Sequence, residues 1–397
     1  MAQLWPLLFS RYALEISFAH RTFAWGSDAR GKAHVHVVIL GLTKREYEPL
    51  EKRLFSYDDV DGALVESRHK ALSPYLIDAS SLRDRHLVVE ERGGPLCDIP
   101  KMITGSKPID GGYFTFNRQE RDDFLKSTPN SAEFLRPFLG AEEYINKGDR
   151  WVLALHKVTP SQLRDMPEVR ERVRKVVLFR LGDIGPLKKE NRPDQKRSKI
   201  TIALAKTPTL YHVNVIPDSP FLVVPQVSSE RREYVPIGWL EPPTIPSDKL
   251  RLILNADLWQ FGIITSRMHM AWMRAITGRL ESRYMYSVGV VYNNFPWPAG
   301  SETQKAKIRA LAQAVLDARA KFPDASLADL YDPDTMPVEL RKAHHKLDAA
   351  VDALYKRGGF DGDRSRVEHL FMLYEKLVAP LTAASGKKRL RKTTSRR

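Results

Sequence analysis

The sequence predicts an α+β protein with a sheet at its amino end, a mixed middle region and a helical carboxyl end. Two early segments, 14–25 and 33–42, are rich in β-branched and aromatic residues, as strands are. In the middle, short strand and helix patterns alternate with loops of Gly and Pro. After residue 298, apolar residues recur at helical spacing. We expect divisions at 1-50, 51-298, 299-380 and 381-397.

Composition favours a nucleic-acid partner. The 397 residues allow two or three domains with real cores, and the formal charge of +15 suits a polyanion. Cys97 is the only cysteine, which excludes an internal disulfide and a Cys-based zinc site and fits a reducing cytoplasm. No apolar run is long enough to span a bilayer, and the amino end lacks the pattern of a signal peptide.

The first two strands are expected to form a hairpin. The connection 26–32 is short and rich in turn residues, too short for a crossover between parallel strands. The second strand is nearly all apolar, which predicts burial on both faces. Phe23 and Trp25, near the end of the first strand, can be ordinary core aromatics.

The middle region contains several candidate phosphate contacts. Glycines punctuate a loop at 105–112, whose amides could hold a phosphate with help from Lys101 and Lys107, although we favour a plain turn. A helix is expected over 161–180 and a charged loop over 188–199. Both are dense in basic residues and are either phosphate-contacting surfaces or solvated faces.

A second hairpin is expected over 221–240, with a Ser-Ser-Glu-Arg-Arg turn. Its turn residues could donate hydrogen bonds to DNA, and Arg231 is favoured on position. No Gly-x-Ser-x-Gly elbow surrounds the serines, so they are not hydrolase nucleophiles. The candidates in this turn are Ser228, Ser229, Arg231 and Arg232.

A helix followed by a strand is expected from Asp257 to Tyr286. Asp257 is a plausible N-cap, apolar residues continue at helical spacing to Ile276, and Gly278 should stop the helix by adopting a positive φ. The next residues alternate as in one strand, and Leu280 faces opposite to the charged side chains.

The charged face of this strand carries Arg279, Glu281 and Arg283. Arg can fork onto guanine and Glu can accept from the cytosine amino group, so this face has the chemistry for reading base edges. A solvated face with cross-strand ion pairs explains the same residues, and on composition alone we favour it.

Three helices are expected after Pro298. The first begins with a capping box at Ser301, the second begins at Pro337, and the third ends before Pro380. The basic tail 381–397 should be disordered and add only nonspecific attraction to DNA.

Long strings of the chain resemble the MmeI-like restriction–modification enzymes, which combine a nuclease, an adenine-N6 DNA methyltransferase and a DNA-reading domain. The strings are FAHRTFAWGSDARGKAHVHVVILGL, GSKPIDGG, EEYINKGDRWVLAL, FLVVPQVSSERREYVPIGWL, GRLESRYMYS and VVYNNFPWP. The resemblance implies the edge of a class I methyltransferase α/β sheet, then a target-recognition domain, then a helical domain. It places a specificity position at Glu281 and Arg283, and Phe23 and Trp25 near the extruded base.

The motifs of the methyltransferase reaction are absent from this sequence. There is no glycine-rich turn for S-adenosylmethionine and no Asn/Asp-Pro-Pro-aromatic loop, since 241–244 lacks both the amide and the aromatic ring. We therefore expect no catalytic residue and no metal site in this chain. The resemblance implies a carboxyl-terminal portion whose methyl donor binds elsewhere, on a polypeptide that carries the missing half.

The expected function is recognition of a specific duplex DNA sequence for an adenine-N6 methyltransferase. Two alternatives stay open. The chain could be a stand-alone DNA-binding or regulatory protein, or an inactive remnant of a split gene that cannot fold alone.

Overall fold

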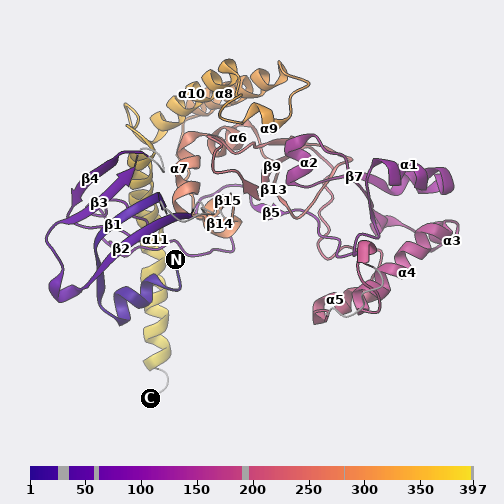
Figure 1. Cartoon of the computed structure of the whole chain (residues 1–397), viewed down its shortest axis with the longest axis horizontal. Helices are drawn as coiled ribbons and strands as arrows, with labels where there is room; N and C mark the ends of the chain where they lie inside the picture. Colours follow the sequence, from indigo (N-terminus) through magenta and orange to yellow (C-terminus); the bar gives the residue numbers. More distant parts are fainter. Residues whose placement is uncertain (26–34, 58–61, 190–195, 281, 395–397) are drawn as a thin grey trace, which may run out of the picture.

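The structure, a computed structural model, describes residues 1–25, 35–57, 62–189, 196–280 and 282–394 (Figure 1). It confirms the α+β class: small sheets dominate the first two thirds of the chain and helices the last third. Figure 1 shows an amino-terminal sheet on one side, a central sheet in the middle and a lobe on the other side.

The amino-terminal sheet has the strand order β2-β1-β3-β4. The pair β1–β2 is antiparallel, which confirms the predicted hairpin, and β1 pairs with β3 in parallel. A short helix at 7–11 and the turn at 45–47 flank the sheet. The strands are β1 (Leu14–Trp25), β2 (Val35–Lys44), β3 (Lys52–Tyr57) and β4 (Leu64–His69).

Strand β2 is an exposed edge, so the prediction that it is buried on both faces is wrong for this chain. Val38, Leu40 and Leu42 keep 48%, 38% and 39% of their surface exposed. The apolar sequence is that of a covered strand, but among the described residues only β1 pairs with it. An unpaired apolar edge of this kind favours association with further chain.

The central sheet has the order β11-β9-β13-β5 and is covered on both faces. The residues of β9 alternate between two apolar clusters: Leu222 and Val224 pack in the largest core, and Phe221 and Val223 in a smaller one. Both faces of this sheet are therefore buried, and the rest of the middle region packs around it. Its strands are β5 (Met102–Thr104), β9 (Phe221–Pro225), β11 (Gly238–Leu240) and β13 (Leu250–Leu254).

The lobe, residues 113–216, has its own apolar core around Phe114, Val152 and Val176. The sheet β12-β7-β8-β6 connects it to the central region through β12. Its strands are β6 (Thr115–Phe116), β7 (Leu135–Leu139), β8 (Trp151–Leu153) and β12 (Ile245–Pro246). Its helices are α1 (Arg118–Ser127), α2 (Ala141–Asn146), α3 (Pro160–Arg164), α4 (Pro167–Leu181) and α5 (Lys199–Ala203).

The basic helix predicted over 161–180 is two helices, α3 and α4, because Pro167 cannot continue the hydrogen bonding of α3 and instead begins α4. Its arginines do not share one phosphate-facing surface. Arg172 turns inward, donates to the Tyr113 carbonyl at 2.8 Å and lies 4.2 Å from the centre of the Phe116 ring. Burial lowers the pKa of its guanidinium.

Arg180 holds the glycine-punctuated loop in place. Its side chain is fully buried and donates to five backbone carbonyls, at distances between 2.8 and 3.2 Å. Gly111 and Gly112 adopt positive φ angles of 67° and 90°, as tight turns require. The loop is thus built as an internally bonded turn. The acceptors are Pro108, Ile109, Leu204, Thr207 and Leu210.

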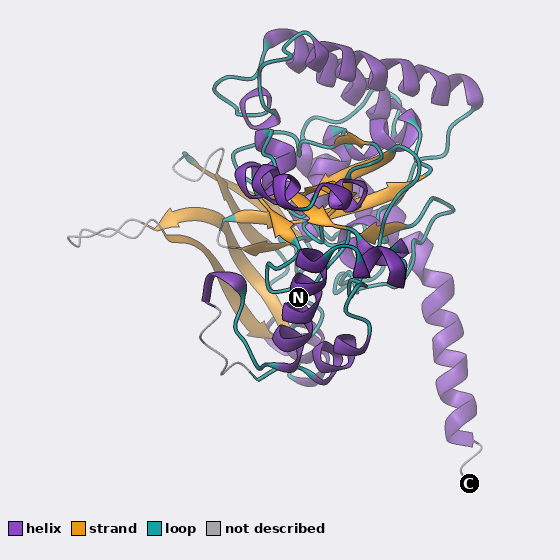
Figure 2. Cartoon of the chain, turned by 90° about the vertical axis from the view of Figure 1, so that its right-hand side faces the viewer, coloured by secondary structure: helices purple, strands orange, loops and turns teal. Residues whose placement is uncertain are grey.

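Helices form the carboxyl end, as predicted, and share the largest core with the central sheet. Asp257 and Ser301 both cap helices through complete capping boxes. The last helix runs through Pro380, so its predicted end is wrong, and Figure 2 shows it projecting from the body. The helices are α6 (Leu258–Ile264), α7 (Arg267–Ile276), α8 (Glu302–Ala320), α9 (Leu327–Leu330), α10 (Val338–Tyr355) and α11 (Asp363–Thr394).

The substitution Arg180→Met should destabilise the lobe by about 3 kcal/mol or more, because it leaves several buried carbonyls without a donor. Arg174→Met on the same helix is the matched control: Arg174 is 61% exposed and pairs with Glu171. The control should cost less than about 1 kcal/mol. Urea unfolding of both variants measures the difference, and equal midpoints would contradict the role given to Arg180.

Candidate nucleic-acid interface

The helix predicted to begin at Asp257 is two helices in the structure. The helix is interrupted at Thr265, and Ser266 caps a second helix by accepting from the His269 amide. The apolar spacing continues across this break, so periodicity alone could not reveal it. Helix α7 ends at Ile276, and Gly278 lies in a strand without a positive φ.

The predicted single strand is a hairpin. Strand β14 (Gly278–Leu280) pairs antiparallel with β15 (Arg283–Met285), so Arg279 lies opposite Tyr284 and Leu280 opposite Arg283. Glu281 lies outside the described residues. Residues directly opposite each other in an antiparallel pair share a face, so Arg279 lies on the face of Tyr284 and Arg283 on the face of Leu280. The prediction that Arg279 and Arg283 share one strand face is therefore wrong.

A third strand brings a distant candidate segment to this hairpin. Strand β10 (Val227–Ser228) pairs antiparallel with β15, with Ser228 opposite Tyr284. The Ser-Ser-Glu-Arg-Arg turn that follows β10 therefore lies beside the hairpin, although the two are about fifty residues apart in sequence. We call this three-stranded unit, β10-β15-β14, the reading sheet.

The tip of the reading sheet is cationic and preordered. Arg279 stacks over the Tyr284 ring, 4.4 Å from its centre, and donates to the Ser282 carbonyl at 2.9 Å. Arg279, Leu280 and Arg283 are exposed. A guanidinium held on an aromatic ring loses less rotamer freedom when it binds a base or a phosphate.

Buried polar and aromatic groups support the hairpin from below. Tyr286 is 2% exposed, and its hydroxyl lies 2.8 Å from Nε2 of the fully buried His269. Burial lowers the pKa of His269 to about 3, so the imidazole is neutral at any functional pH. His269 is therefore an uncharged structural partner of Tyr286 beneath the hairpin.

Ion pairs anchor the Ser-Ser-Glu-Arg-Arg turn to the helices. Arg274 donates to the carbonyls of Arg232 and Glu233. The Glu233 carboxylate in turn pairs with Arg267 of α7 at 2.6 Å and with Arg341 of α10 at 2.9 Å. The turn is thus fixed from two sides.

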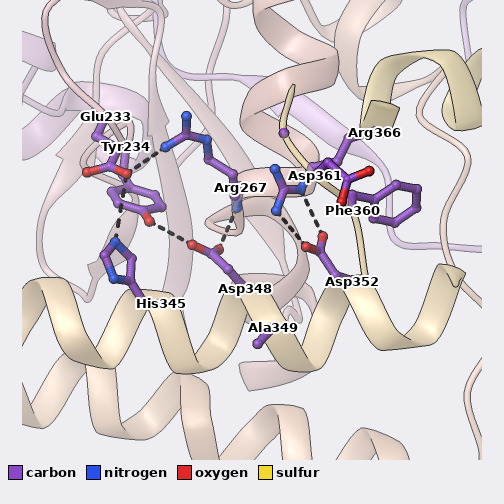
Figure 3. A pocket seen from close by; sticks show the side chains of 11 residues that line it. Glu233, Tyr234, Arg267, His345, Asp348, Ala349, Asp352, Phe360, Asp361 and Arg366 are labelled. Atoms are coloured by element: carbon purple, nitrogen blue, oxygen red, sulfur yellow. Dashed lines mark hydrogen bonds and ion pairs between the residues drawn. The ribbon is translucent and has the colours of Figure 1, made fainter. Parts of the chain in front are cut away.

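A polar pocket of about 350 Å³ lies next to this anchor (Figure 3). In it, Asp348 accepts from the Tyr234 hydroxyl at 2.6 Å and from the Arg267 amide at 2.6 Å. Figure 3 shows Arg366 directed at Asp352 on the same wall, where the pair is bidentate. The polar groups named above already pair with each other. The pocket therefore lies where the segment that follows β10 packs against the helices α7, α10 and α11.

The four candidates of the turn differ in accessibility. Ser228 is 4% exposed, and its hydroxyl has no partner among the described residues. Ser229 accepts from the Arg231 amide, which caps the turn. Arg231 is 59% exposed and pairs with the exposed Asp334, whereas Arg232 is half-buried. Arg231 is therefore the most accessible of the four.

The remaining candidates lie on other elements. Lys101 and Lys107 are exposed and flank β5 of the central sheet. Phe23 stacks on Tyr57 at 5.1 Å, and Trp25 is 54% exposed at the end of β1. In this chain neither ring is in a closed core. Figure 1 places the reading sheet between the amino-terminal sheet and the lobe.

The structure adds two neighbours of the reading sheet that sequence reasoning missed. Gln226 accepts from the Tyr286 amide at 2.7 Å and donates its own amide to the Lys249 carbonyl at 2.9 Å. Lys249 is exposed. These hydrogen bonds join segments that are distant in sequence, so no local sequence pattern predicts them. Among the described residues no His, Cys, Asp and Glu cluster could hold a metal, and no helix there could cross a membrane.

Comparison with known proteins decides the family. The MmeI target recognition domain matches residues 83–299, the MmeI C-terminal domain matches 300–382, and the MmeI DNA-methyltransferase domain matches 1–56. The chain belongs to the MmeI family. The resemblance noted in its sequence is thereby confirmed.

Two relatives of this MmeI-family chain are informative. DNA methyltransferase A of Bacillus subtilis (strain 168) is 35% identical over 377 residues, which are 94% of this chain and 40% of the relative. The solved structure of the type IIL restriction-modification enzyme MmeI in complex with DNA is 39% identical, with a TM-score of 0.83. That match covers 95% of this chain and 48% of MmeI. The chain thus spans two fifths to one half of these relatives.

Asp348 predicts a pH dependence of stability for this MmeI-family chain. Burial raises its pKa to about 6 from the usual 3.8. A carboxyl with a raised folded pKa stabilises the fold fully below pH 3.8, and this contribution is lost as the pH rises through about 6. Asp348→Asn should remove this loss, which is on the order of 2–3 kcal/mol.

Thermal melting between pH 4 and pH 7 measures this effect. Asp361→Asn is the matched control, since Asp361 lines the same pocket but is exposed. The Asp348 variant should show a flatter pH profile than both the control and the unaltered chain. Identical slopes for all three would contradict the assignment.

Proposed function

We propose that this chain recognises a specific sequence of duplex DNA for an adenine-N6 methyltransferase of the MmeI type, with the reading sheet as its base-reading element. The observation that carries the proposal is the exposed cationic tip, Arg279 and Arg283, on a hairpin whose base is fully packed. A related structure, MmeI in complex with DNA, superposes over 95% of the chain.

The hairpin has the size and the chemistry for the major groove. A two-stranded ribbon fits that groove, and an arginine can donate two hydrogen bonds to O6 and N7 of guanine. Glu281, next to the turn in sequence, supplies an acceptor for the cytosine amino group. On this chemistry Arg283 and Glu281 are assigned to one base pair, and Arg279, which lies on the face of Tyr284, is assigned to a neighbouring contact.

Other exposed cations would bind the phosphate backbone. Arg231 next to the reading sheet, and Lys101 and Lys107 beside the central sheet, are placed to neutralise phosphates and so fix the register without reading sequence. Ser229 and Arg232 add polar atoms to the same turn. Ser228 is assigned a supporting role, since its hydroxyl points away from solvent.

The aromatic rings at the end of β1 suit an extruded base. Phe23 and Trp25 lie 6.2 Å apart between ring centres, and Trp25 offers an exposed face. Base-modifying enzymes stack a flipped nucleotide on aromatic side chains of this kind.

The methyl donor S-adenosylmethionine does not fit the residues present. The methyltransferase-type part of the chain contributes an edge hairpin and one parallel pair of strands, without a glycine-rich turn after a strand. We assign the donor and the catalytic loop to a partner polypeptide or to further chain. The apolar edge at Val38, Leu40 and Leu42 is where such a segment would pair. We assign the protein to the cytoplasm, which the lone Cys97 supports because cysteines stay reduced in that compartment.

Reversing the charge order at the tip tests the reading role. Glu281→Lys with Arg283→Asp keeps the summed charge, so nonspecific affinity and its salt dependence should barely change. Preference at one position of the recognised site should change by about 1–3 kcal/mol. Selection of bound duplexes from a random pool, followed by sequencing, measures this preference.

The matched control is Glu171→Lys with Arg174→Asp, which reverses an exposed ion pair of 2.7 Å on α4 of the lobe. It should leave the selected sequence unchanged. The proposal fails if the tip variant selects the same sequence as the unaltered chain. A uniform loss of binding to all DNA would show that the tip contacts phosphates or supports the fold.

The missing half should be supplied in trans. The pure chain, incubated with labelled S-adenosylmethionine and mixed-sequence duplex DNA, should transfer no methyl group, because neither donor nor acceptor is held. Co-expression with a polypeptide that carries the rest of the methyltransferase domain should raise solubility and yield site-specific methylation. Label transfer by the pure chain would contradict the first expectation. A well-behaved monomer that is indifferent to that polypeptide would show that the sheet is complete without it.

A further inference from the structure

A connector between two parts of the protein depends on the carboxyl-terminal helix. The family matches cover 1–56 and 83–299, so residues 57–82 belong to neither domain. The segment 69–84, here called the connector, contains no helix and only one isolated bridge, Leu72 to Asp78. Leu72 packs in the core of the amino-terminal sheet, and Ile77 packs in the largest core.

Helix α11 contacts the connector at three points along one face. Arg364 lies 2.7 Å from Nε2 of His69, at the start of the connector. The Phe371 ring lies 4.8 Å from the ring of Tyr75. Residues 364, 371 and 375 are spaced by seven and four, which places them on the same side of an α-helix.

The third contact is the most specific of the three. The Glu375 carboxylate accepts from the backbone amides of Arg83 at 3.2 Å and Asp84 at 2.7 Å. These residues are the first of the part that matches the target recognition domain. A side chain of the carboxyl-terminal domain thus caps the entry into the recognition domain, through charge-assisted hydrogen bonds.

The same helix also touches the element that carries the reading sheet. Phe371 and Tyr374 lie 5.3 and 5.8 Å from Trp272 of α7, and α7 leads directly into β14. On the other side, the half-buried Arg21 of β1 donates twice to the carbonyl of Leu76 in the connector. A continuous set of contacts therefore runs from the amino-terminal sheet through the connector and α11 to α7.

We infer that α11 holds the connector in place and thereby fixes the reading sheet relative to the methyltransferase-type sheet. The positioning residues are Arg364, Phe371 and Glu375. The backbone hydrogen bonds within the connector are local, such as those from Ala79 to Ala71 at 3.0 Å and from Ser73 to Ile77 at 3.1 Å. They fold the connector on itself and do not constrain its position between the two sheets. A helix that contacts it at both ends and in the middle supplies that constraint. Only the description of the hairpin as a DNA reader depends on the proposed function.

The test is a distance measurement that needs no DNA. Cysteines placed at the exposed Thr22 of β1 and the exposed Met285 of β15, in a Cys97→Ser background, carry two spin labels. Double electron–electron resonance then reports the separation of the two sheets. The full-length chain should give one narrow distance distribution.

Phe371→Ala and Glu375→Ala should broaden or shift that distribution, and Glu375→Gln, which retains one acceptor, should give an intermediate result. Glu375→Ala should also speed amide exchange at Arg83 and Asp84 about tenfold, equivalent to about 1.4 kcal/mol of local opening. The matched controls are Phe116→Ala, a fully buried ring in the lobe, and Lys376→Ala, the exposed neighbour on α11.

Both controls should keep the narrow distribution even where they lower the melting temperature. Unchanged distances in Phe371→Ala and Glu375→Ala, or equal broadening in the controls, would overturn the inference. A failure to bind specific DNA would overturn the proposed function but leave this distance result as it stands.

Discussion

The packing of Trp272 is the constraint on which the rest of the structure depends. Its ring is fully buried, its indole nitrogen donates to the Val291 carbonyl at 3.1 Å, and it contacts Phe371 and Tyr374 of α11. It therefore joins the helix that precedes the hairpin, the segment that follows the hairpin, and the last helix. With these three elements fixed, the exposed tip of the reading sheet is held in one orientation toward a ligand.

The charged side chains differ in the same way between the fixed base of the hairpin and its exposed tip. The ion pairs of Glu233, Arg267 and Asp363 are partly buried at the joint between the turn and the helices, where they fix geometry. The neutral His269 lies under the hairpin, where its ring nitrogen contacts the Tyr286 hydroxyl. Arg279 at the exposed tip is preordered on Tyr284, which favours specific over diffuse contact with a polyanion.

The sequence could predict elements whose signal is local. Capping by Asp257 and Ser301, the hairpin from β1 to β2 and the helical carboxyl end all follow from neighbouring residues. It could not predict the break at Thr265, because the apolar period continues across it. It also missed the hairpin of β14 and β15, because Glu281 and Ser282, which separate the two strands in sequence, carry none of the Asn-Gly or Asp-Gly signals of a tight hairpin. The pairing of Ser228 with Tyr284 and the capping of Asp84 by Glu375 are long-range contacts without a local signature.

The central claim, that the hairpin contacts bases, can be tested by site-directed photo-crosslinking from position 280. Leu280 is 47% exposed on β14, and a photoreactive residue there would lie within the reading sheet. The account predicts crosslinks from position 280 to bases of the duplex that the chain selects, and none from the equally exposed Leu181 at the end of α4. Crosslinks that map only to the sugar–phosphate backbone, or that are absent at 280, would contradict it.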